Sequence, residues 1–342
     1  MKHTASILTV LSLFFLGNFN QSQSITTVKR TKPTIHVHWE GEKKFYHLAN
    51  NHLRAWPLFN VYNESFFNQH RLPKGPIKYR NADYKTVEST TLENLLHEVI
   101  YEIHNGKTNF KHFTLIHDRT FNKKLTAGSL VLKFNDYPFI AKIFMENPYS
   151  FVHPFKKGWV QYFFFLIGGG VNRHIAGFTR ITNLEHVNKC IAQDPYWSSL
   201  FDIPRKWFWT PSHNKNLEII GCNIGSYAYQ KITMPGTYCI ITDAIEADES
   251  DQPAKENMQE TIKNLCCYLD FCIDFNTDNF IIERNTQKIV IIDTEHYPTL
   301  VGITQKPECA HSYSSLVFFI IKNSIRNIFF NAQTQSGTPF DM

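Results

Sequence analysis

The chain has 342 residues, of which 43% are hydrophobic and 15% aromatic, and Phe alone supplies 29 of them. This composition can bury a large core, which excludes a wholly disordered protein. The 35 Lys and Arg outweigh the 30 Asp and Glu by +5. That excess is too small and too scattered to indicate a dedicated nucleic-acid binder. The length predicts two or three structural units, or one large two-lobed domain.

The first 24 residues have the layout of a secretory signal peptide. Lys2 precedes the apolar run 5–16, and Ser22 and Ser24 are small residues at positions −3 and −1 of a cleavage site. The apolar run is shorter than the stretch of about 20 residues that spans a membrane. An uncleaved N-terminal anchor or a frayed hydrophobic tail is the alternative. We therefore expect a secreted or periplasmic protein, cleaved near Ser24, with no stable membrane span after cleavage.

Seven cysteines are present, and no two of them are spaced as Cys-x-x-Cys. This spacing argues against a zinc ribbon or a thioredoxin-type site. We expect most of the cysteines to be small buried hydrophobic residues. Export would allow one or two disulfides, but the sequence leaves their pairing open.

Residues 25–88 are predicted to be an irregular segment with a preference for β-structure. Within it, residues 34–39 alternate polar and apolar side chains, as a half-buried strand does. His36 and His38 would share one face of this strand. Two such imidazoles are able to bind a metal, but the sequence offers no third ligand nearby. A solvated strand face is the preferred interpretation.

The middle of the chain predicts a helix followed by a β-hairpin. Apolar residues recur at helical spacing over 91–104, with Ser89 or Thr90 as the N-terminal cap and Gly106 after the end. Strand patterns follow, and the last two of them are joined by a polar turn, which is typical of an antiparallel hairpin. The strands are predicted at 113–116, 129–134 and 139–144, with the turn at 135–138.

Helices and strands alternate in the rest of the chain. Thr182 and Glu185 are spaced as a capping box, which predicts a helix start. An acidic, polar stretch at 246–251 is typical of a linker between two lobes. The predicted helices cover 182–193, 256–272 and 312–331, and the predicted strands cover 219–229, 237–242, 280–282 and 288–293, the last two as a hairpin.

The run Gly168–His174 is the most unusual local sequence in the chain. Its three consecutive glycines expose backbone N–H groups that can surround an anion, and Arg173 adds positive charge. A flexible turn explains the same run equally well. The sequence leaves its role open.

Three chemical motifs follow one another along the chain. Lys142 lies inside an apolar strand, where its ammonium group is costly unless it meets an anion. Asp274 and Asn279 form an Asp-x-x-x-x-Asn pattern between a predicted helix and a predicted strand. Asp293 ends the apolar strand of the next hairpin. Each motif alone is common, but their order and context favour a shared site.

This order of motifs resembles the protein-kinase-like superfamily over roughly residues 111–300, closer to the atypical and small-molecule kinases than to eukaryotic protein kinases. The resemblance implies an α+β, two-lobed kinase-like fold with an antiparallel β-sheet small lobe and a reduced, mainly helical large lobe. It also implies ATP and Mg²⁺. By this resemblance Lys142 holds the α- and β-phosphates, Asp274 accepts the proton of the acceptor substrate, and Asn279 and Asp293 bind magnesium.

The same resemblance assigns two further positions by their order in the chain. The strand 238–245 would be the hinge, with the backbone of Asp243, Ala244 and Ile245 facing adenine. Glu185 is the best candidate for the acidic helix residue that pairs with Lys142. The sequence also departs from the family pattern, because no Gly-x-Gly-x-x-Gly precedes Lys142 and the metal motif reads Asp-Thr-Glu.

These observations predict a signal peptide at 1–24, an accessory segment at 25–110, a kinase-like N-lobe with an insertion at 111–246 and a reduced C-lobe at 247–342. The predicted function is an exported, ATP- and magnesium-dependent phosphotransferase that acts on a protein or a small molecule. A pseudokinase-type nucleotide-binding or scaffolding module is one alternative. A secreted interaction protein that binds no nucleotide is the other. Whether the protein is an enzyme stays open, because only 49 residues follow Asp293.

Overall fold

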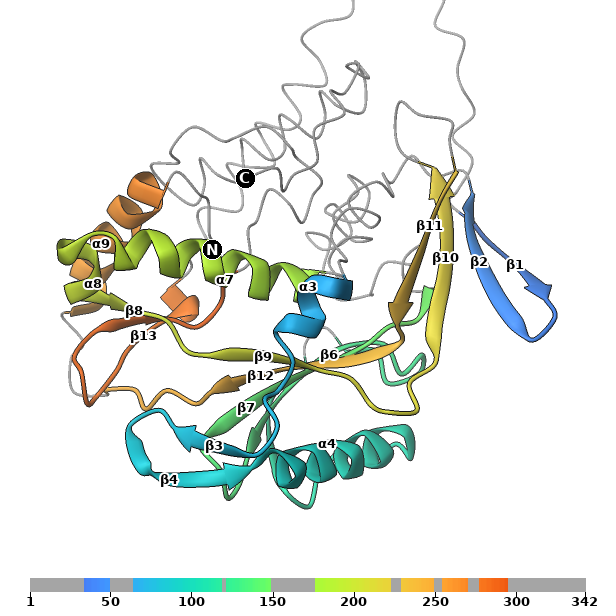
Figure 1. Ribbon diagram of the computed structural model, residues 1–342, viewed down its shortest axis with the longest axis horizontal. Helices are drawn as coiled ribbons and strands as arrows, with labels where there is room; N and C mark the ends of the chain where they lie inside the picture. The colour runs from blue at the N-terminus through green and yellow to red at the C-terminus, as the bar shows by residue number, and fades with distance from the viewer. Residues whose placement is uncertain are drawn as a thin grey trace, which may run out of the picture. The chain divides into compact units, whose positions relative to one another are not determined.

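The computed structural model describes residues 34–49, 64–118, 121–148, 176–222, 229–248, 254–269 and 277–294. Within them the fold is mixed α+β, with several antiparallel sheets and few helices (Figure 1), which confirms the predicted α+β class. None of the helices in these ranges is long and apolar enough to cross a membrane. The predicted signal peptide, the run Gly168–His174 and the predicted helix 312–331 lie outside the described residues.

A five-stranded antiparallel sheet contains the predicted hairpin. Its strand order is β5-β6-β7-β12-β9. The β6–β7 hairpin pairs Lys133 with Ile140 across the predicted turn. The strands are β5 (Phe113–His117), β6 (Gly128–Phe134), β7 (Phe139–Met145), β9 (Lys206–Trp209) and β12 (Thr237–Asp243). The four predicted strands of this sheet are confirmed, and β9 is an addition.

The two faces of the five-stranded sheet carry different chemistry. One face supplies buried residues such as Leu132, Ala141 and Ile241, which pack with the helix α4 (Ser89–His104) in one apolar core (Figure 1). Because side chains alternate along a strand, Lys142 on β7 and Lys206 on β9 point to the opposite face. The sheet therefore has an apolar face and a face that bears two lysines.

The apolar core also includes part of the predicted accessory segment. The hairpin of β3 (Pro76–Tyr79) and β4 (Ala82–Glu88) contributes Ile77 and Val87 to it. Residues before position 110 therefore share a core with the five-stranded sheet.

The ends of α4 test two capping predictions. The N-cap is Glu88, whose side chain makes no capping hydrogen bond, so the prediction of Ser89 or Thr90 as the cap is wrong. The Ser89 hydroxyl instead accepts a hydrogen bond of 3.1 Å from the backbone N–H of Gly75. Gly106 follows the helix with φ of 74°, a left-handed conformation that favours glycine, as predicted for the stop.

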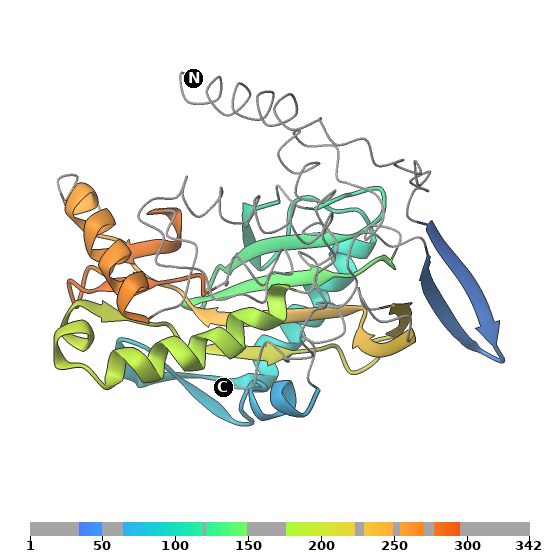
Figure 2. The ribbon, with the colours of Figure 1, turned by 90° about the horizontal axis from the view of Figure 1, so that it is seen from above.

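A second apolar core is built from three helices and a three-stranded sheet (Figure 2). Val187 of α7, Trp197 of α8, Ile262 of α9 and Phe280 of β13 meet in it. The predicted β13–β14 hairpin is confirmed, and β8 pairs in parallel with β14. The elements are α7 (Ala176–Ala192), α8 (Pro195–Leu200), β8 (Phe201–Asp202), α9 (Ala254–Leu269), β13 (Phe280–Ile282) and β14 (Ile289–Ile291).

Two predicted elements have different bounds in the structure. Helix α7 begins at Ala176, so the predicted capping box of Thr182 and Glu185 is wrong, because both residues lie inside the helix. The predicted strand 219–229 is instead two antiparallel strands, β10 (Asn216–Cys222) and β11 (Tyr229–Pro235). The predicted strand runs across the point between Cys222 and Tyr229 where the chain reverses, so its pattern did not reveal the reversal.

Several short elements complete the described fold. The strand β10 pairs in parallel with β2, and β2 forms a hairpin with β1. Together with β11 these strands make a four-stranded sheet in the order β1-β2-β10-β11. In helix α9, Cys267 is disulfide-bonded. The remaining bounds are β1 (Thr34–Glu40), β2 (Lys43–Ala49), α3 (Glu64–Gln69) and the 3-10 helix η2 (Thr277–Asn279).

Candidate functional site

Charged side chains gather around Asp293 on the lysine-bearing face of the five-stranded sheet. The Nζ atom of Lys142 lies 3.2 Å from Oδ2 of Asp293, although the two residues are 151 positions apart in the sequence. The contact joins the third strand of the sheet to the segment directly after β14. We call the group the Asp293 cluster, which consists of Lys142, Arg180, Lys206, Asp293 and Thr294.

Arg180 reaches Asp293 from helix α7. Its Nε atom donates to both carboxylate oxygens of Asp293, at 2.9 and 3.1 Å. The helix period explains this position, because Arg180 lies on the same stripe of α7 as Val187 and Ile191 of the second core. The stripe is apolar toward the C-terminus of α7 and polar near its N-terminus, where it faces the Asp293 cluster.

The backbone after β14 is fixed by three further hydrogen bonds at Thr294, whose side chain is buried. The Thr294 hydroxyl donates to the carbonyl oxygen of Arg180 at 2.6 Å and accepts from Nζ of the buried Lys206 at 3.3 Å. The side-chain amide of Asn183 donates to the Thr294 carbonyl oxygen at 3.0 Å. Helix α7 and strand β9 therefore hold the carboxylate of Asp293 in place.

The electrostatics of the cluster keep Asp293 ionised. Burial alone would raise the pKa of Asp293, but the charges of Arg180, Lys142 and Lys206 outweigh burial and hold that pKa well below its usual range. The side chains of Lys142 and Asp293 remain 23% and 18% exposed. A mostly buried carboxylate anion thus lies among three positively charged side chains, of which Lys142 is partly exposed.

An aromatic residue lies beside the two cations nearest the carboxylate. Phe144 follows Lys142 by two positions on β7 and therefore points to the same face. Its ring centre lies 6.0 Å from Nζ of Lys142 and 5.9 Å from Cζ of Arg180, close enough for weak cation–π attraction. The ring stacks on Tyr238 with 4.7 Å between centroids. This packing restrains both cations.

The structure brings three of the predicted site residues together. Asn279 ends η2, and its backbone carbonyl accepts a hydrogen bond of 2.9 Å from the N–H of Ile292, next to Asp293. Lys142 and Asp293 therefore meet through their side chains, and the backbone of Asn279 lies beside the residue before Asp293. Asp274 lies outside the described residues.

Glu185 does not form the expected ion pair with Lys142. Its Oε1 atom contacts Nε2 of His70 at 2.5 Å. Glu185 follows Arg180 by five positions, which places it about 140° further around α7, away from the site. The helix thus contributes a basic residue to the Asp293 cluster where the resemblance implied an acidic one. The stripe of α7 was the sequence signal that could have identified Arg180.

The predicted hinge is partly engaged within the chain. The carboxylate of Asp243 is buried and binds Arg205, with Nη2 to Oδ1 at 2.6 Å. The backbone N–H of Asp243 donates to the Arg205 carbonyl at 3.3 Å, and that of Ala244 donates to the Pro138 carbonyl at 2.9 Å. Any adenine contact in this segment therefore falls to Ile245 and to the backbone carbonyl groups.

A third histidine joins the pair predicted on strand β1. His47 of β2 lies opposite His36, and its Nε2 atom is 2.6 Å from Nδ1 of His38. Sequence reasoning missed His47 because β2 was not predicted. Across the described ranges, however, no three His, Cys, Asp or Glu residues are arranged to hold a metal ion.

Comparison of the chain with protein-family models, with curated proteins and with solved structures finds no match. A function for the Asp293 cluster therefore rests on the residues, contacts and charges of the cluster itself.

Proposed function

We propose that the Asp293 cluster and Asn279 form the phosphate- and magnesium-binding centre of an exported, kinase-like phosphotransferase that uses ATP. The observation that carries this proposal is the 3.2 Å contact between Lys142 and Asp293. Kinases need a strand lysine on the ATP phosphates and a metal-binding Asp after the hairpin that follows the catalytic loop. The proposal includes the two-lobed kinase-like fold implied by the resemblance.

The donor types at the site fit magnesium. Mg²⁺ prefers hard oxygen ligands, and it is commonly held by one or two carboxylates together with phosphate oxygens and water. Asp293 offers an ionised carboxylate because its pKa is held far below its usual range. The side-chain amide oxygen of Asn279 is the second ligand in the proposal. When bound, the metal would neutralise charge on the transferred phosphoryl group.

The cationic side chains of the cluster suit a polyphosphate. The ammonium group of Lys142 is a compact point charge, whereas the planar guanidinium of Arg180 can donate two parallel hydrogen bonds to phosphate oxygens. Both side chains already lie on Asp293, beside the proposed metal position. Lys206 adds a third positive charge from strand β9.

The remaining roles follow the resemblance. Asp274 accepts the proton of the acceptor hydroxyl, which belongs to a protein or a small molecule, and Ile245 contributes backbone contacts to adenine. Export is supported by the N-terminal sequence and by the disulfide at Cys267, since disulfides persist in oxidising compartments.

A nucleotide-binding pseudokinase is the second candidate function. Arg180 donates to both oxygens of Asp293, which are the atoms that a magnesium ion would need. If Arg180 keeps these two hydrogen bonds, Asp293 is not available to a metal ion. The basic side chains would then bind an anion without phosphoryl transfer. The two candidates share ATP binding and differ in turnover.

Thermal unfolding of the full chain with ATP and Mg²⁺ tests nucleotide binding. Ligand at 100 times its Kd should stabilise the wild type by about 2.7 kcal/mol, and the melting temperature should rise accordingly. Lys142→Met and Asp293→Asn should lose this rise. Lys231→Met is a matched control, because Lys231 pairs with Glu218 on the four-stranded sheet. An unchanged melting temperature in the wild type would refute both candidates.

Phosphate release and phosphate transfer from ATP separate the two candidates. A phosphotransferase should turn ATP over, and Asp274→Asn should stop turnover while leaving the thermal shift in place. A thermal shift without any turnover would identify the pseudokinase instead.

A further inference from the structure

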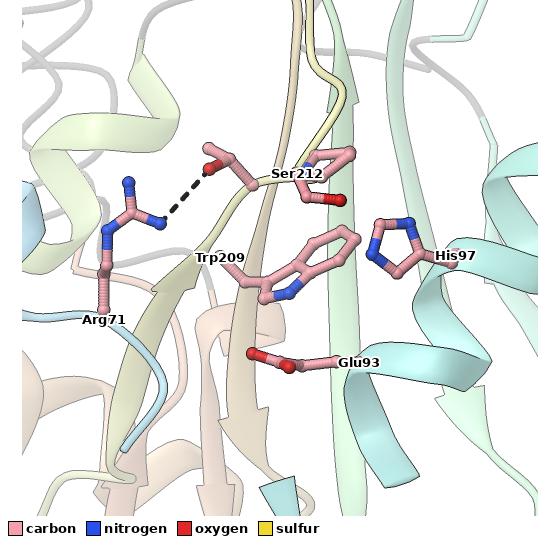
Figure 3. Close-up of a pocket in the computed structure, with 7 residues that line it drawn as sticks. Arg71, Glu93, His97, Trp209 and Ser212 are labelled. Atoms are coloured by element: carbon pink, nitrogen blue, oxygen red, sulfur yellow. Dashed lines mark hydrogen bonds between the residues drawn. The ribbon is translucent and has the colours of Figure 1, made fainter. Parts of the chain in front are cut away.

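A pocket of about 350 Å³ opens where α4, the end of β9 and the segment after α3 meet (Figure 3). Its volume lies within the range of small-molecule sites. None of its residues belongs to the Asp293 cluster, so it is a separate feature of the fold. The lining residues that matter here are Arg71, Glu93, His97, Trp209, Thr210 and Ser212.

Two opposite charges line this pocket without neutralising each other. Among the described residues, no hydrogen bond or ion pair reaches the half-buried carboxylate of Glu93. Arg71 uses Nε to bind Oδ1 of Asn68 at 2.8 Å and Nη1 to bind Oγ1 of Thr210 at 3.3 Å. These bonds orient the guanidinium and leave Nη2 for a ligand. The pocket therefore offers a fixed cation and a carboxylate with hydrogen-bonding capacity to spare.

An indole ring also lines the pocket. In Figure 3, Trp209 lies between Arg71 on one side and His97 on the other, with Glu93 reaching toward the ring. The ring of His97 packs edge-on against Trp209, with 5.0 Å between centroids and 76° between planes. A cation beside an indole gains from the ring quadrupole as well as from a nearby carboxylate. Only 4% of Trp209 is exposed, so an ammonium group on Glu93 would contact the part of the indole that lines the pocket.

We propose that this pocket binds a small zwitterion of the amino-acid type, with the ligand carboxylate on Arg71 and the ligand ammonium between Glu93 and Trp209. Carboxylate–guanidinium and ammonium–carboxylate bonds are the strong, charge-assisted kind. The pocket has roughly the liquid volume of a dozen water molecules at about 30 Å³ each, which suits a free amino acid or a dipeptide. The proposal is independent of the function of the Asp293 cluster.

Calorimetric titration of the full chain with each of the twenty L-amino acids tests the proposal. At least one should bind, and its N-acetylated and amidated derivatives should each bind about tenfold more weakly or worse, since each loses one charged hydrogen bond. An N-acetylated derivative that binds as tightly as the free amino acid would overturn the assigned ammonium position. A complete lack of binding would overturn the site.

Two variants and a control connect binding to the pocket. Glu93→Gln and Arg71→Gln should each weaken the best amino acid by about tenfold or more. Glu98→Gln is the matched control on α4, because Glu98 binds Lys111 and His112 outside the pocket. All three variants should keep the unliganded melting temperature of the wild type, because these side chains are exposed or half-buried. Equal affinity in wild type, Glu93→Gln and Arg71→Gln would contradict the proposal.

Discussion

Two charge clusters tie distant segments of this protein together, and they are built in opposite ways. In the Asp293 cluster, Lys142, Arg180 and Lys206 act on one carboxylate. In the other cluster, one guanidinium serves two carboxylates, because Arg80 donates to Asp202 at 2.5 Å and to Glu283 at 3.1 Å. We call this second group the Arg80 cluster, which consists of Arg80, Asn81, Asp202, Glu283 and Thr286.

The Arg80 cluster satisfies its buried carboxylate from several directions. Glu283 is fully buried, and its oxygens also accept hydrogen bonds of 3.0 Å from Asn81 and 2.7 Å from Thr286. Burial would raise the pKa of Glu283, but these hydrogen bonds and the charge of Arg80 lower it below its ordinary value. The network joins the β3–β4 turn to the end of β8 and to the segment that follows β13.

The difference between the clusters fits a structural role for the Arg80 cluster and the proposed binding role for the Asp293 cluster. The fully buried Glu283 carboxylate is satisfied by direct hydrogen bonds, which stabilises one conformation and leaves little for a ligand to gain, although Asp202 of the same cluster is 42% exposed. The Asp293 cluster instead keeps its carboxylate and one lysine in contact with solvent. An incoming polyphosphate can therefore exchange contacts with those side chains.

The largest loss of stability is expected for Asp293→Asn. Arg180 and Lys206 are buried and lose the carboxylate charge that faces them, while only Lys142 is partly exposed, so we expect about 3–5 kcal/mol. Urea unfolding monitored by circular dichroism measures this loss. This variant should also lose nucleotide binding. An Asp293→Asn variant that still binds ATP would contradict the proposed binding role of the Asp293 cluster.

A smaller loss of stability is expected for Glu283→Gln. The variant leaves Arg80 paired with Asp202 but puts a neutral amide in place of the fully buried carboxylate, so we expect about 1–3 kcal/mol by the same urea measurement. The thermal shift caused by ATP and Mg²⁺ should survive at a temperature where the variant is folded. Loss of that shift would place the Arg80 cluster in the binding site.

The free energy of unfolding should fall at acid pH because the Arg80 cluster loses the charge of Glu283. The pKa of Glu283 is lower in the folded state than its ordinary value. Its contribution is thus complete above the unfolded Glu pKa of about 4.3 and is lost as the pH falls from there through the folded pKa. One proton accounts for up to about 1.4 kcal/mol per pH unit. Stability measured from pH 6 to pH 3 should fall less steeply in Glu283→Gln than in the wild type, and equal slopes would contradict this linkage.

The smallest effect is expected for Glu185→Ala. Its contact with His70 is largely exposed, and such pairs contribute less than about 1 kcal/mol. The melting temperature should change little, and the response to ATP should match the wild type. A lost response to ATP would show that Glu185 pairs with Lys142 when nucleotide is bound, as the resemblance implied.

Local patterns predicted the elements that hold Lys142 and Asp293. The β6–β7 hairpin has a clear polar turn between two apolar strands, and the β13–β14 hairpin repeats this pattern, so their pairing depends on neighbouring residues alone. That dependence explains why Lys142 and Asp293 were identified without the structure. The β9 strand is only four residues long and was missed, and Lys206 was missed with it.

The sequence pattern did not show that Arg180 is the residue of helix α7 that reaches Asp293, because that depends on tertiary packing. The start of α7 was placed at Thr182, which removed Arg180 from the helix and favoured Glu185 as the residue facing Lys142. Helical phase is set by packing against the second core, which is a tertiary property. The pocket beside α4 could not be predicted for the same reason, since Arg71, Glu93 and Trp209 come from three separate segments.

Calorimetric titration of the full chain with ATP, with and without Mg²⁺, tests the central claim most directly. The account predicts that ATP binds, that Mg²⁺ strengthens binding, and that Asp293→Asn removes the effect of Mg²⁺ while Asp202→Asn retains it. Binding that is absent, or that responds to Mg²⁺ equally in wild type and Asp293→Asn, would contradict the assignment of the Asp293 cluster as a phosphate- and magnesium-binding centre.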